Sequence, residues 1–240
     1  MEFDDVCFSY IEGTEVIHDF SLDVMPGEKV AIVGPTGAGK TTLVNLLMRF
    51  YETDSGDIRV DGTSVKDMPR ARVHSLFSMV LQDVWLFDGT IRENLQFNME
   101  GVTDETLDGA CRAAGVYDFV MGLPKGYDTV IGGISGLSSG QKQQLSIARA
   151  IIRDAPMVIF DEATSAVDTR TERAIQGAVG SLTEGRTSFI IAHRLSTIRD
   201  CDKIIVMREG RLIESGTHES LIADRGFYYE LYTSQFENCG

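Results

Sequence analysis

The sequence predicts an α/β fold in which a buried parallel sheet is combined with an antiparallel layer and an inserted helical lobe. Three short runs rich in valine and isoleucine, at residues 29–34, 157–162 and 187–193, are typical of parallel strands that are buried on both faces. The stretch between the first two runs is far longer than one crossover helix, so a lobe is expected inside it. Residues 1–60 alternate short strand-like runs with turns such as "MPGE" and "VDGT", which indicates the antiparallel layer.

The inserted lobe is predicted to be helical. Thr103 has the side chain of an N-cap, helix-forming residues follow it, and Gly122 and Pro124 close the segment. A second long helix is expected in the run "SSGQKQQLSIARAIIRDAP", and it ends before Pro156.

The last predicted strands form a hairpin. The run at 203–216 breaks at Glu209 and Gly210 into two short pieces, as expected for two strands and a turn. We therefore expect one domain that spans the whole chain. Residues 1–82 and 156–240 are assigned to the core and the antiparallel layer, and residues 83–155 to the helical lobe.

The composition is that of an ordinary soluble globular protein, with 43% apolar and 24% charged residues. A formal net charge of −14 argues against a surface that neutralises a nucleic-acid backbone, so no nucleic-acid partner is expected. No apolar run is long enough to span a membrane, and the first residues do not form a signal peptide; a strand begins at once, as if the chain had been cut from something longer. Four cysteines lie far apart and are expected to be free thiols: Cys7, Cys111, Cys201 and Cys239.

The strongest single signal for chemistry is "GPTGAGKT", which follows a predicted strand and opens a predicted helix. Its glycines allow successive backbone N–H groups to point at one phosphate, and the helix N-terminus adds partial positive charge. Lys40 is expected to reach the β- and γ-phosphates of a nucleoside triphosphate, and Thr41 to bind Mg²⁺. The strand before the loop and the helix after it disfavour a merely structural turn.

Two adjacent carboxylates end the apolar run "MVIF". Asp161 is placed to hold a Mg²⁺ shell, and Glu162 to orient and deprotonate an attacking water. Acidic residues at this position also begin helices, because the N-terminal pole of a helix is positive. The phosphate loop elsewhere in the chain favours the catalytic interpretation.

Two further polar residues follow apolar runs. His193 lies at the C-terminal end of a predicted strand, the sheet edge where parallel α/β folds bind ligands. Such a histidine is by itself more often a core residue, but an edge shared with Asp161 favours contact with a γ-phosphate. Gln82 either couples the metal or the attacking water to the helical lobe or is an ordinary loop glutamine.

Three other stretches have two interpretations each. Ser138 and Ser139 start a polar helix and either cap its N–H groups or leave them to face an anion that this chain does not hold. Tyr10 ends a strand-like run and either stacks on a base or is an ordinary strand aromatic. The Trp-Leu-Phe triplet at 85–87 is more often core than interface, and it is a docking surface only if it is exposed.

Together, these motifs and their order resemble the ATP-binding cassette (ABC) family along nearly the whole chain. The resemblance implies a RecA-like P-loop NTPase core with an antiparallel β subdomain and an inserted α-helical subdomain. It places the family signature on "LSSGQ" at 137–141, adds the "SAVD" loop at 165–168, and implies ATP and Mg²⁺ as cofactors. For catalysis it implies Glu162, His193, Gln82 and Lys40, and for the metal Thr41, Gln82 and Asp161. For ATP binding it implies Tyr10, Gly34, Pro35, Thr36, Gly37, Ala38, Gly39, Lys40, Thr41, Thr42, Ser138, Ser139, Gly140, Gln141 and Asp168.

The segments "VLQDVWLFDGTIRENL", "GYDTVIGG" and "RGFYYELYTSQF" resemble the nucleotide-binding domains of bacterial multidrug or lipid exporters. This resemblance implies an ATPase at the cytoplasmic face of the cell membrane, with a membrane domain that precedes Met1 and is absent from this chain. Two such domains would face head to tail as a homodimer or a heterodimer. Each of two ATP molecules would lie between one phosphate loop and the partner's signature, and hydrolysis to ADP and phosphate would reopen the pair. The cytoplasmic loops of a transmembrane domain would be further partners.

The sequence departs from the family pattern at two places. Ser139 stands where the family usually has glycine, and "GGISG" before it is shorter than usual and lacks a glutamate. This pattern either marks the weaker site of a heterodimer or reflects a neutral exchange of two small residues. A soluble clamp on DNA or ribosomes and a non-hydrolysing regulatory module are the alternative functions. The single cassette and the acidic charge disfavour the clamp.

Overall fold

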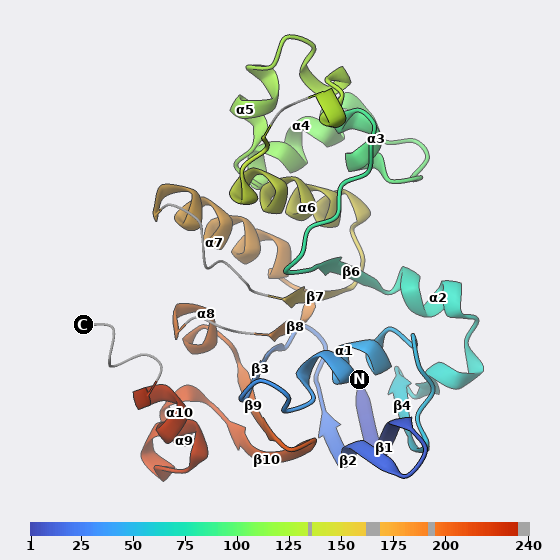
Figure 1. Cartoon of the computed structure of the whole chain (residues 1–240), viewed down its shortest axis with the longest axis vertical. Helices are drawn as coiled ribbons and strands as arrows, with labels where there is room; N and C mark the ends of the chain where they lie inside the picture. The colour runs from blue at the N-terminus through green and yellow to red at the C-terminus, as the bar shows by residue number, and fades with distance from the viewer. Residues whose placement is uncertain (134–135, 162–168, 192–194, 235–240) are drawn as a thin grey trace. The chain divides into compact units, whose positions relative to one another are not determined.

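The computed structural model describes residues 1–133, 136–161, 169–191 and 195–234 (Figure 1). The chain divides into two compact units, of which the first consists of Met1–Phe77 and Gly185–Gly240 and the second of Ser78–Glu184. The predicted helical lobe, 83–155, lies within the second unit. That unit extends beyond the predicted lobe because helix α7 (Thr169–Thr183) packs against helix α6 (Ser139–Arg153).

The predicted antiparallel layer is present in the first unit. Strand β1 pairs antiparallel with β2 on one side and with β4 on the other, and the order of the sheet is β2-β1-β4-β5. Phe3 and Phe20 meet edge to face across β1 and β2, with ring centroids 5.3 Å apart, and both are buried in the core. The four strands are β1 (Glu2–Ile11), β2 (Thr14–Asp23), β4 (Ser55–Val60) and β5 (Thr63–Ser64).

The predicted parallel strands at 29–34 and 187–193 and the terminal hairpin are also confirmed. Strand β3 (Lys29–Val33) lies between β8 (Thr187–Ile191) and β9 (Lys203–Arg208) and is parallel to both. Strand β10 (Arg211–Gly216) pairs antiparallel with β9 across a tight turn at Glu209 and Gly210. The side chains of β8 are buried along its whole length, as the continuous apolar run predicts.

Short helices complete the first unit. Helix α9 packs on β10 and against α10, and Thr217 caps α9 with a reciprocal bond to Ser220. Glu214 of β10 accepts a hydrogen bond of 2.9 Å from the Tyr228 N–H at the start of α10. The helical segments are α1 (Lys40–Leu47), η1 (Val65–Asp67), α2 (Arg70–Ser75), α8 (Leu195–Arg199), α9 (His218–Asp224) and α10 (Phe227–Tyr232).

The second unit is mostly helical. Thr103 caps helix α4 by accepting a hydrogen bond of 3.2 Å from the Thr106 N–H, as expected. The segment that follows is two helices rather than one, because Gly115 has a φ of 71° and its carbonyl accepts a bond from the Gln144 side chain. The remaining elements are β6 (Phe77–Val80), α3 (Ile91–Gln96), α4 (Asp104–Ala113), α5 (Tyr117–Met121), η2 (Gly126–Asp128), η3 (Ile131–Gly133) and β7 (Met157–Asp161).

The predicted long helix is α6, which ends at Arg153 and therefore before Pro156. Asp154 closes it in the left-handed conformation with a φ of 50°. The cysteines of the described residues, Cys7, Cys111 and Cys201, are free thiols as expected, and Cys239 lies outside those residues. None of the helices in the described ranges is long and apolar enough to cross a membrane.

Candidate nucleotide-binding site

The predicted phosphate loop joins the buried strand β3 to helix α1. Gly39 stands at the N-cap of α1 with a φ of 102° and has no side chain to cap the helix. The first turn of α1 contains no acidic residue, whereas α4 begins with a Thr103 cap and two acids. The positive end of α1 thus has no anionic side chain of its own in its first turn, which suits a bound phosphate.

Two glycines of the loop lie in restricted positions within the first unit, Gly34 because a backbone atom is too close and Gly39 because its φ of 102° is positive. A Cβ at Gly34 would lie 2.3 Å from the Met207 carbonyl oxygen, and the φ of Gly34 is 155°. A Cβ at Gly39 would lie 2.9 Å from the Ile17 side chain. Gly37 differs, because its φ of 82° is positive but the space around it is open. The loop therefore rests directly on the end of β9.

Lys40 reaches back over the loop. Its ammonium nitrogen donates to the carbonyl oxygens of Gly34 at 2.7 Å and of Pro35 at 2.9 Å. The charge is thereby held at the mouth of the loop, where phosphate oxygens are expected. Thr41 is exposed in the first turn of α1, so its hydroxyl is accessible to a metal ion, whereas Thr42 is buried.

The turn between β9 and β10 packs against the phosphate loop, a contact that the sequence did not predict. The Gly210 N–H donates to the Ala38 carbonyl oxygen at 3.1 Å, and the Gly210 carbonyl accepts from the His18 N–H at 3.0 Å. A Cβ at Gly210 would lie only 2.0 Å from the Val16 carbonyl oxygen. The sequence marks Gly210 as a turn residue, but it does not show that the turn lies against the phosphate loop.

We expect Gly210→Ala to lower the free energy of unfolding by about 3 kcal/mol, because it adds a backbone clash to the strain of a positive φ. Gly62→Ala is the matched control, since Gly62 has a φ of 75° in an equivalent hairpin turn but nothing within 4 Å of its would-be Cβ. The control is expected to cost about 1 kcal/mol. Urea unfolding curves measure both values, and equal losses would exclude the clash as the cause.

Tyr10 lies next to the phosphate-loop helix. Its hydroxyl donates to the Thr42 hydroxyl at 3.2 Å and accepts from the Asn45 side-chain amide at 3.2 Å. Its ring is supported edge to face by Tyr51, with centroids 5.0 Å apart, and 46% of Tyr10 is exposed. The ring is thus oriented by α1 and still accessible for stacking on a base. Thr42 serves here as a hydrogen-bond partner of Tyr10, and its predicted contact with ATP stays a prediction.

The other predicted catalytic and metal-binding residues belong to the second unit or lie outside the described residues. Asp161 ends β7 and is partly exposed, and Gln82 follows β6 and is exposed. A hydroxyl, an amide and one carboxylate are hard oxygen donors that fit Mg²⁺, which usually takes few protein ligands. Within the described residues, no group of three or more histidine, cysteine, aspartate or glutamate side chains forms a metal site of another kind. Three predicted residues lie outside the described ranges: Glu162, Asp168 and His193.

The signature segment begins helix α6 with a reciprocal cap. The Ser138 hydroxyl accepts from the Gln141 N–H at 3.2 Å, and the Gln141 side chain accepts from the Ser138 N–H at 2.9 Å. The predicted capping role of Ser138 is therefore confirmed. A hydroxyl has one proton to donate besides its acceptor sites, so Ser138 can cap α6 and still donate to an anion. Ser138 and Ser139 are exposed and Gly140 is buried.

An exposed aromatic residue follows Gln82 in the second unit. Trp85 is 64% exposed, so the expectation of a core position is wrong for this residue, although Leu86 and Phe87 are partly covered. Arg149 of α6 holds this stretch by donating to the carbonyl oxygens of Asn94 at 2.8 Å and of Trp85 at 3.3 Å. Burial lowers the pKa of Arg149, which remains charged because the usual arginine pKa is so high.

A buried strand, a glycine loop and a helix with an uncapped N-terminus define a phosphate-loop nucleotide-binding domain. More narrowly, the chain belongs to the ABC transporter family, because residues 17–165 match the sequence profile of the family described as ABC transporter. The motifs predict both the fold, with its mixed parallel and antiparallel sheets, and the class, an ATP-binding domain of this family.

Relatives and a solved structure agree with this assignment. The chain is 50% identical over 238 residues to the "Uncharacterized ABC transporter ATP-binding protein YfiC" of Bacillus subtilis, covering 99% of this chain and 39% of that protein. It is 54% identical over 233 residues to the "Fatty acid ABC transporter ATP-binding/permease protein" of Mycobacterium bovis, covering 96% of this chain and 37% of that protein. The structure of a bacterial Atm1-family ABC exporter with ATP bound matches with a TM-score of 0.90 at 41% identity, covering 98% of this chain and 41% of that one.

The chain therefore spans only 37% to 39% of the length of these two relatives. Both relatives are described as ABC transporter proteins, and the matching structure is an exporter. The clamp on DNA or ribosomes and the regulatory module receive no support from these comparisons.

Proposed function

We propose that this chain hydrolyses ATP to ADP and phosphate and that it powers export through a membrane domain. The observation that carries this proposal is the position of the Lys40 ammonium over the loop at the start of α1, a helix whose first turn contains no acidic residue and whose N-cap, Gly39, has no side chain. Tyr10, tied to the same helix at Thr42, lies where it would stack on the adenine. These features bind a nucleoside triphosphate by its phosphates and by its base.

Hydrolysis is assigned to residues of both units. Mg²⁺ would offset the negative charge of the phosphates, and Thr41, Gln82 and Asp161 would hold it. Glu162 would orient the attacking water and accept its proton, and His193 would contact the γ-phosphate. Lys40 would stabilise the negative charge that develops between the β- and γ-phosphates.

The signature is assigned to a second copy or a homologous partner in a head-to-tail dimer. Ser138 is exposed at the start of a helix of 15 residues, and no acidic residue lies in the first turn of that helix. The free proton of its hydroxyl and the positive helix end suit a phosphate that the partner holds. Ser139 and the "SAVD" loop ending at Asp168 are expected to line the same interface.

The membrane domain is assigned to the exposed side of the second unit near Gln82. Trp85 presents a large aromatic side chain to solvent, and Arg149 fixes the backbone that carries it. An exposed tryptophan on a well-anchored loop suits a cytoplasmic loop of a transmembrane domain, for which it would act as an anchor. This assignment places the chain at the cytoplasmic face of the cell membrane.

Two substitutions of Ser138 test the proposed head-to-tail dimer, in which each ATP lies between one phosphate loop and the partner's signature. Asp and Asn both cap helices well, so the thermal stability of either variant should remain close to that of the wild type. Ser138→Asp also places a negative charge against the partner's γ-phosphate, whereas Ser138→Asn has the same shape without the charge. We expect Ser138→Asp to abolish ATP-dependent dimerisation and most phosphate release, and Ser138→Asn to retain both in large part.

Sedimentation velocity with Mg-ATP and a phosphate-release assay measure these outcomes. ATP binding to the monomer should be equal in both variants, because Ser138 contacts only the partner's nucleotide in this arrangement. If the Asp variant dimerises as well as the Asn variant and the wild type, the signature does not lie at the nucleotide interface. A wild-type chain that releases no phosphate from ATP would refute the proposed hydrolysis.

A further inference from the structure

Three aromatic rings of the first unit gather beside the phosphate-loop helix. The rings of Phe8 and Tyr10, two residues apart on β1, meet at 84° with centroids 4.8 Å apart. The Tyr51 ring stands at 90° to the Tyr10 ring, with centroids 5.0 Å apart, and its centroid lies 5.5 Å from that of Phe8. Edge-to-face pairs at such distances attract each other beyond the area that they bury. The Tyr10 ring is thus held by two neighbours that come from different segments of the chain.

The three rings differ in their exposure. Phe8 is buried in the core, whereas 46% of Tyr10 and 44% of Tyr51 are exposed. Two half-exposed rings in contact leave apolar surface that a further flat group can cover. A nucleotide base has this chemistry, because every base presents a π-face on which an aromatic side chain can stack.

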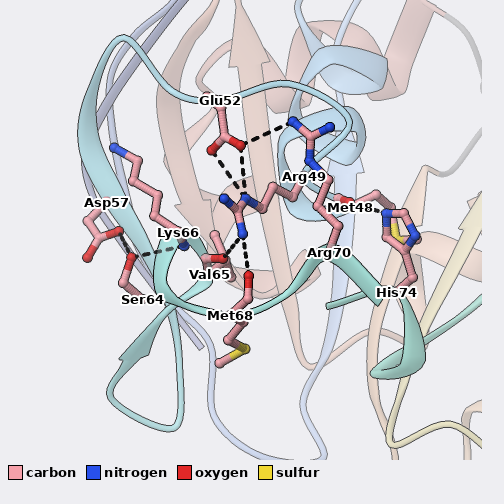
Figure 2. A network of polar contacts seen from close by, with 10 residues as sticks. All are labelled: Met48, Arg49, Glu52, Asp57, Ser64, Val65, Lys66, Met68, Arg70 and His74. Atoms are coloured by element: carbon pink, nitrogen blue, oxygen red, sulfur yellow. Dashed lines mark hydrogen bonds and ion pairs between the residues drawn. The ribbon is translucent and has the colours of Figure 1, made fainter. Parts of the chain in front are cut away.

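The backbone on both sides of Tyr51 is held by the Arg49 side chain. Arg49 follows the C-cap of α1, and its Nε donates to both Glu52 carboxylate oxygens at 3.0 and 3.2 Å, so that the bridge spans Tyr51 (Figure 2). Its Nη1 donates to the Val65 carbonyl oxygen at 2.8 Å and also to that of Met68. Only 15% of the Arg49 side chain is exposed. A planar guanidinium with acceptors in several fixed directions holds one orientation, and the segment around Tyr51 is fixed with it.

Backbone hydrogen bonds tie the same segment to α1 and to β1. The Phe50 N–H donates to the Asn45 carbonyl oxygen of α1 at 2.9 Å, and the Asn45 side-chain amide donates to the Tyr10 hydroxyl at 3.2 Å. The Asp54 N–H donates to the Cys7 carbonyl oxygen of β1 at 2.9 Å. The segment is therefore anchored on α1 before its tyrosine and on β1 after it. All of these contacts lie within the first unit.

We propose that Tyr51 is a positioning residue that holds the Tyr10 ring in the orientation required for stacking on the base of ATP. The inference rests on the proposed function and adds to it a residue that lies in none of the predicted motifs. A side chain that is already held in its bound conformation loses less entropy when the ligand arrives. The loss of Tyr51 should therefore weaken recognition of the base and leave recognition of the phosphates by Lys40 unchanged.

The test compares ATP with inorganic tripolyphosphate, which carries the phosphates without a base. Tyr51→Leu removes the ring and keeps an apolar side chain, and calorimetric titration in EDTA measures binding without hydrolysis. We expect Tyr51→Leu to weaken ATP binding about fivefold, within the range of edge-to-face aromatic pairs, and to change tripolyphosphate binding by less than about twofold. With Mg²⁺ present, KM for ATP should rise by a similar factor and kcat should change by less than about twofold.

Two further substitutions separate positioning from general structure. Phe50→Leu makes the same kind of change one residue earlier, at a half-exposed ring that contacts the His74 ring with centroids 5.5 Å apart. This control should leave both affinities unchanged. Tyr51→Phe keeps the ring and should bind ATP like the wild type, because the edge-to-face contact requires the ring and not the hydroxyl.

A double-mutant cycle with Tyr10→Ala decides whether Tyr51 acts through Tyr10. In the Tyr10→Ala chain, replacing Tyr51 with leucine should have no further effect on ATP affinity, because no ring remains to be positioned. Factors that multiply in the double variant would overturn the proposal. An equal loss of ATP and tripolyphosphate binding in Tyr51→Leu would also overturn it, since that result indicates general destabilisation of the phosphate loop.

The failure of this inference and the failure of the proposed function give different results. A wild-type chain that binds neither ATP nor tripolyphosphate would refute the proposed nucleotide site and the role of Tyr51 with it. A wild-type chain that binds and hydrolyses ATP, but whose affinity is the same in Tyr51→Leu, would overturn the role of Tyr51 alone.

Discussion

Replacing Lys40 with alanine is expected to lower the rate of ATP hydrolysis by about 100-fold or more. The reason is that the substitution removes the charged donor that stabilises the negative charge developing in the transition state. The Lys40 ammonium is held over the loop by the Gly34 and Pro35 carbonyl oxygens, so it is placed before ATP arrives. ATP affinity should also fall, because the positive charge contacts the phosphates in the ground state. Phosphate release and binding of a fluorescent ATP analogue measure the two effects.

Lys66→Ala is the matched control for this substitution. Lys66 lies in the same unit, is exposed, and also donates to a glycine carbonyl oxygen, that of Gly56 at 3.0 Å. The Lys66→Ala substitution removes one positive charge at a distance from the phosphate loop and should leave the rate of ATP hydrolysis unchanged. Equal losses in both variants would mean that the overall charge, rather than the position of Lys40, determines the rate.

Replacing Glu162 with glutamine is expected to abolish most hydrolysis and to accumulate an ATP-bound dimer. An amide has nearly the shape of the carboxylate but cannot accept the proton of the attacking water. The loss of one negative charge near the γ-phosphate should also favour the closed dimer. Sedimentation velocity with Mg-ATP and a single-turnover assay measure the dimer and the rate.

Glu184→Gln makes the same chemical change at an exposed position of the second unit and serves as the control. It should hydrolyse ATP like the wild type and should not accumulate the dimer. Equal turnover in Glu162→Gln and the wild type would refute the assignment of Glu162 as the catalytic base. A Glu162→Gln variant that hydrolyses ATP slowly but never dimerises would instead refute the proposed ATP-bound dimer.

The elements were predictable wherever the local pattern alone determines the structure. The apolar runs of β3, β7 and β8 are continuous because both faces of these strands are buried. Thr103 and Ser138 cap their helices because a short oxygen-bearing side chain at the N-cap satisfies a nearby N–H group. The glycines and lysine of the phosphate loop likewise follow from the backbone that a phosphate requires.

The predictions failed where packing between distant segments decides. A continuous helical pattern does not reveal that the Gly115 carbonyl is bound by Gln144 of α6, which divides α4 from α5. The apolar triplet at 85–87 suggests a core, but Arg149 holds the backbone so that Trp85 lies outside. In both cases the partner comes from α6, far along the chain, and no local pattern announces it.

The sequence by itself determined the class of the protein, its phosphate loop and the residue types that its chemistry needs, because these depend on short spacings along one strand and one helix. Only the tertiary structure decided that the Gly210 turn packs against the phosphate loop and that Arg49, which follows α1, binds the carbonyl oxygens of Val65 and Met68. Such contacts join backbone groups of segments that are distant in sequence, and a carbonyl oxygen has the same chemistry in every residue. The packing of the fold therefore determines which segments meet, and the residue types alone do not predict these contacts.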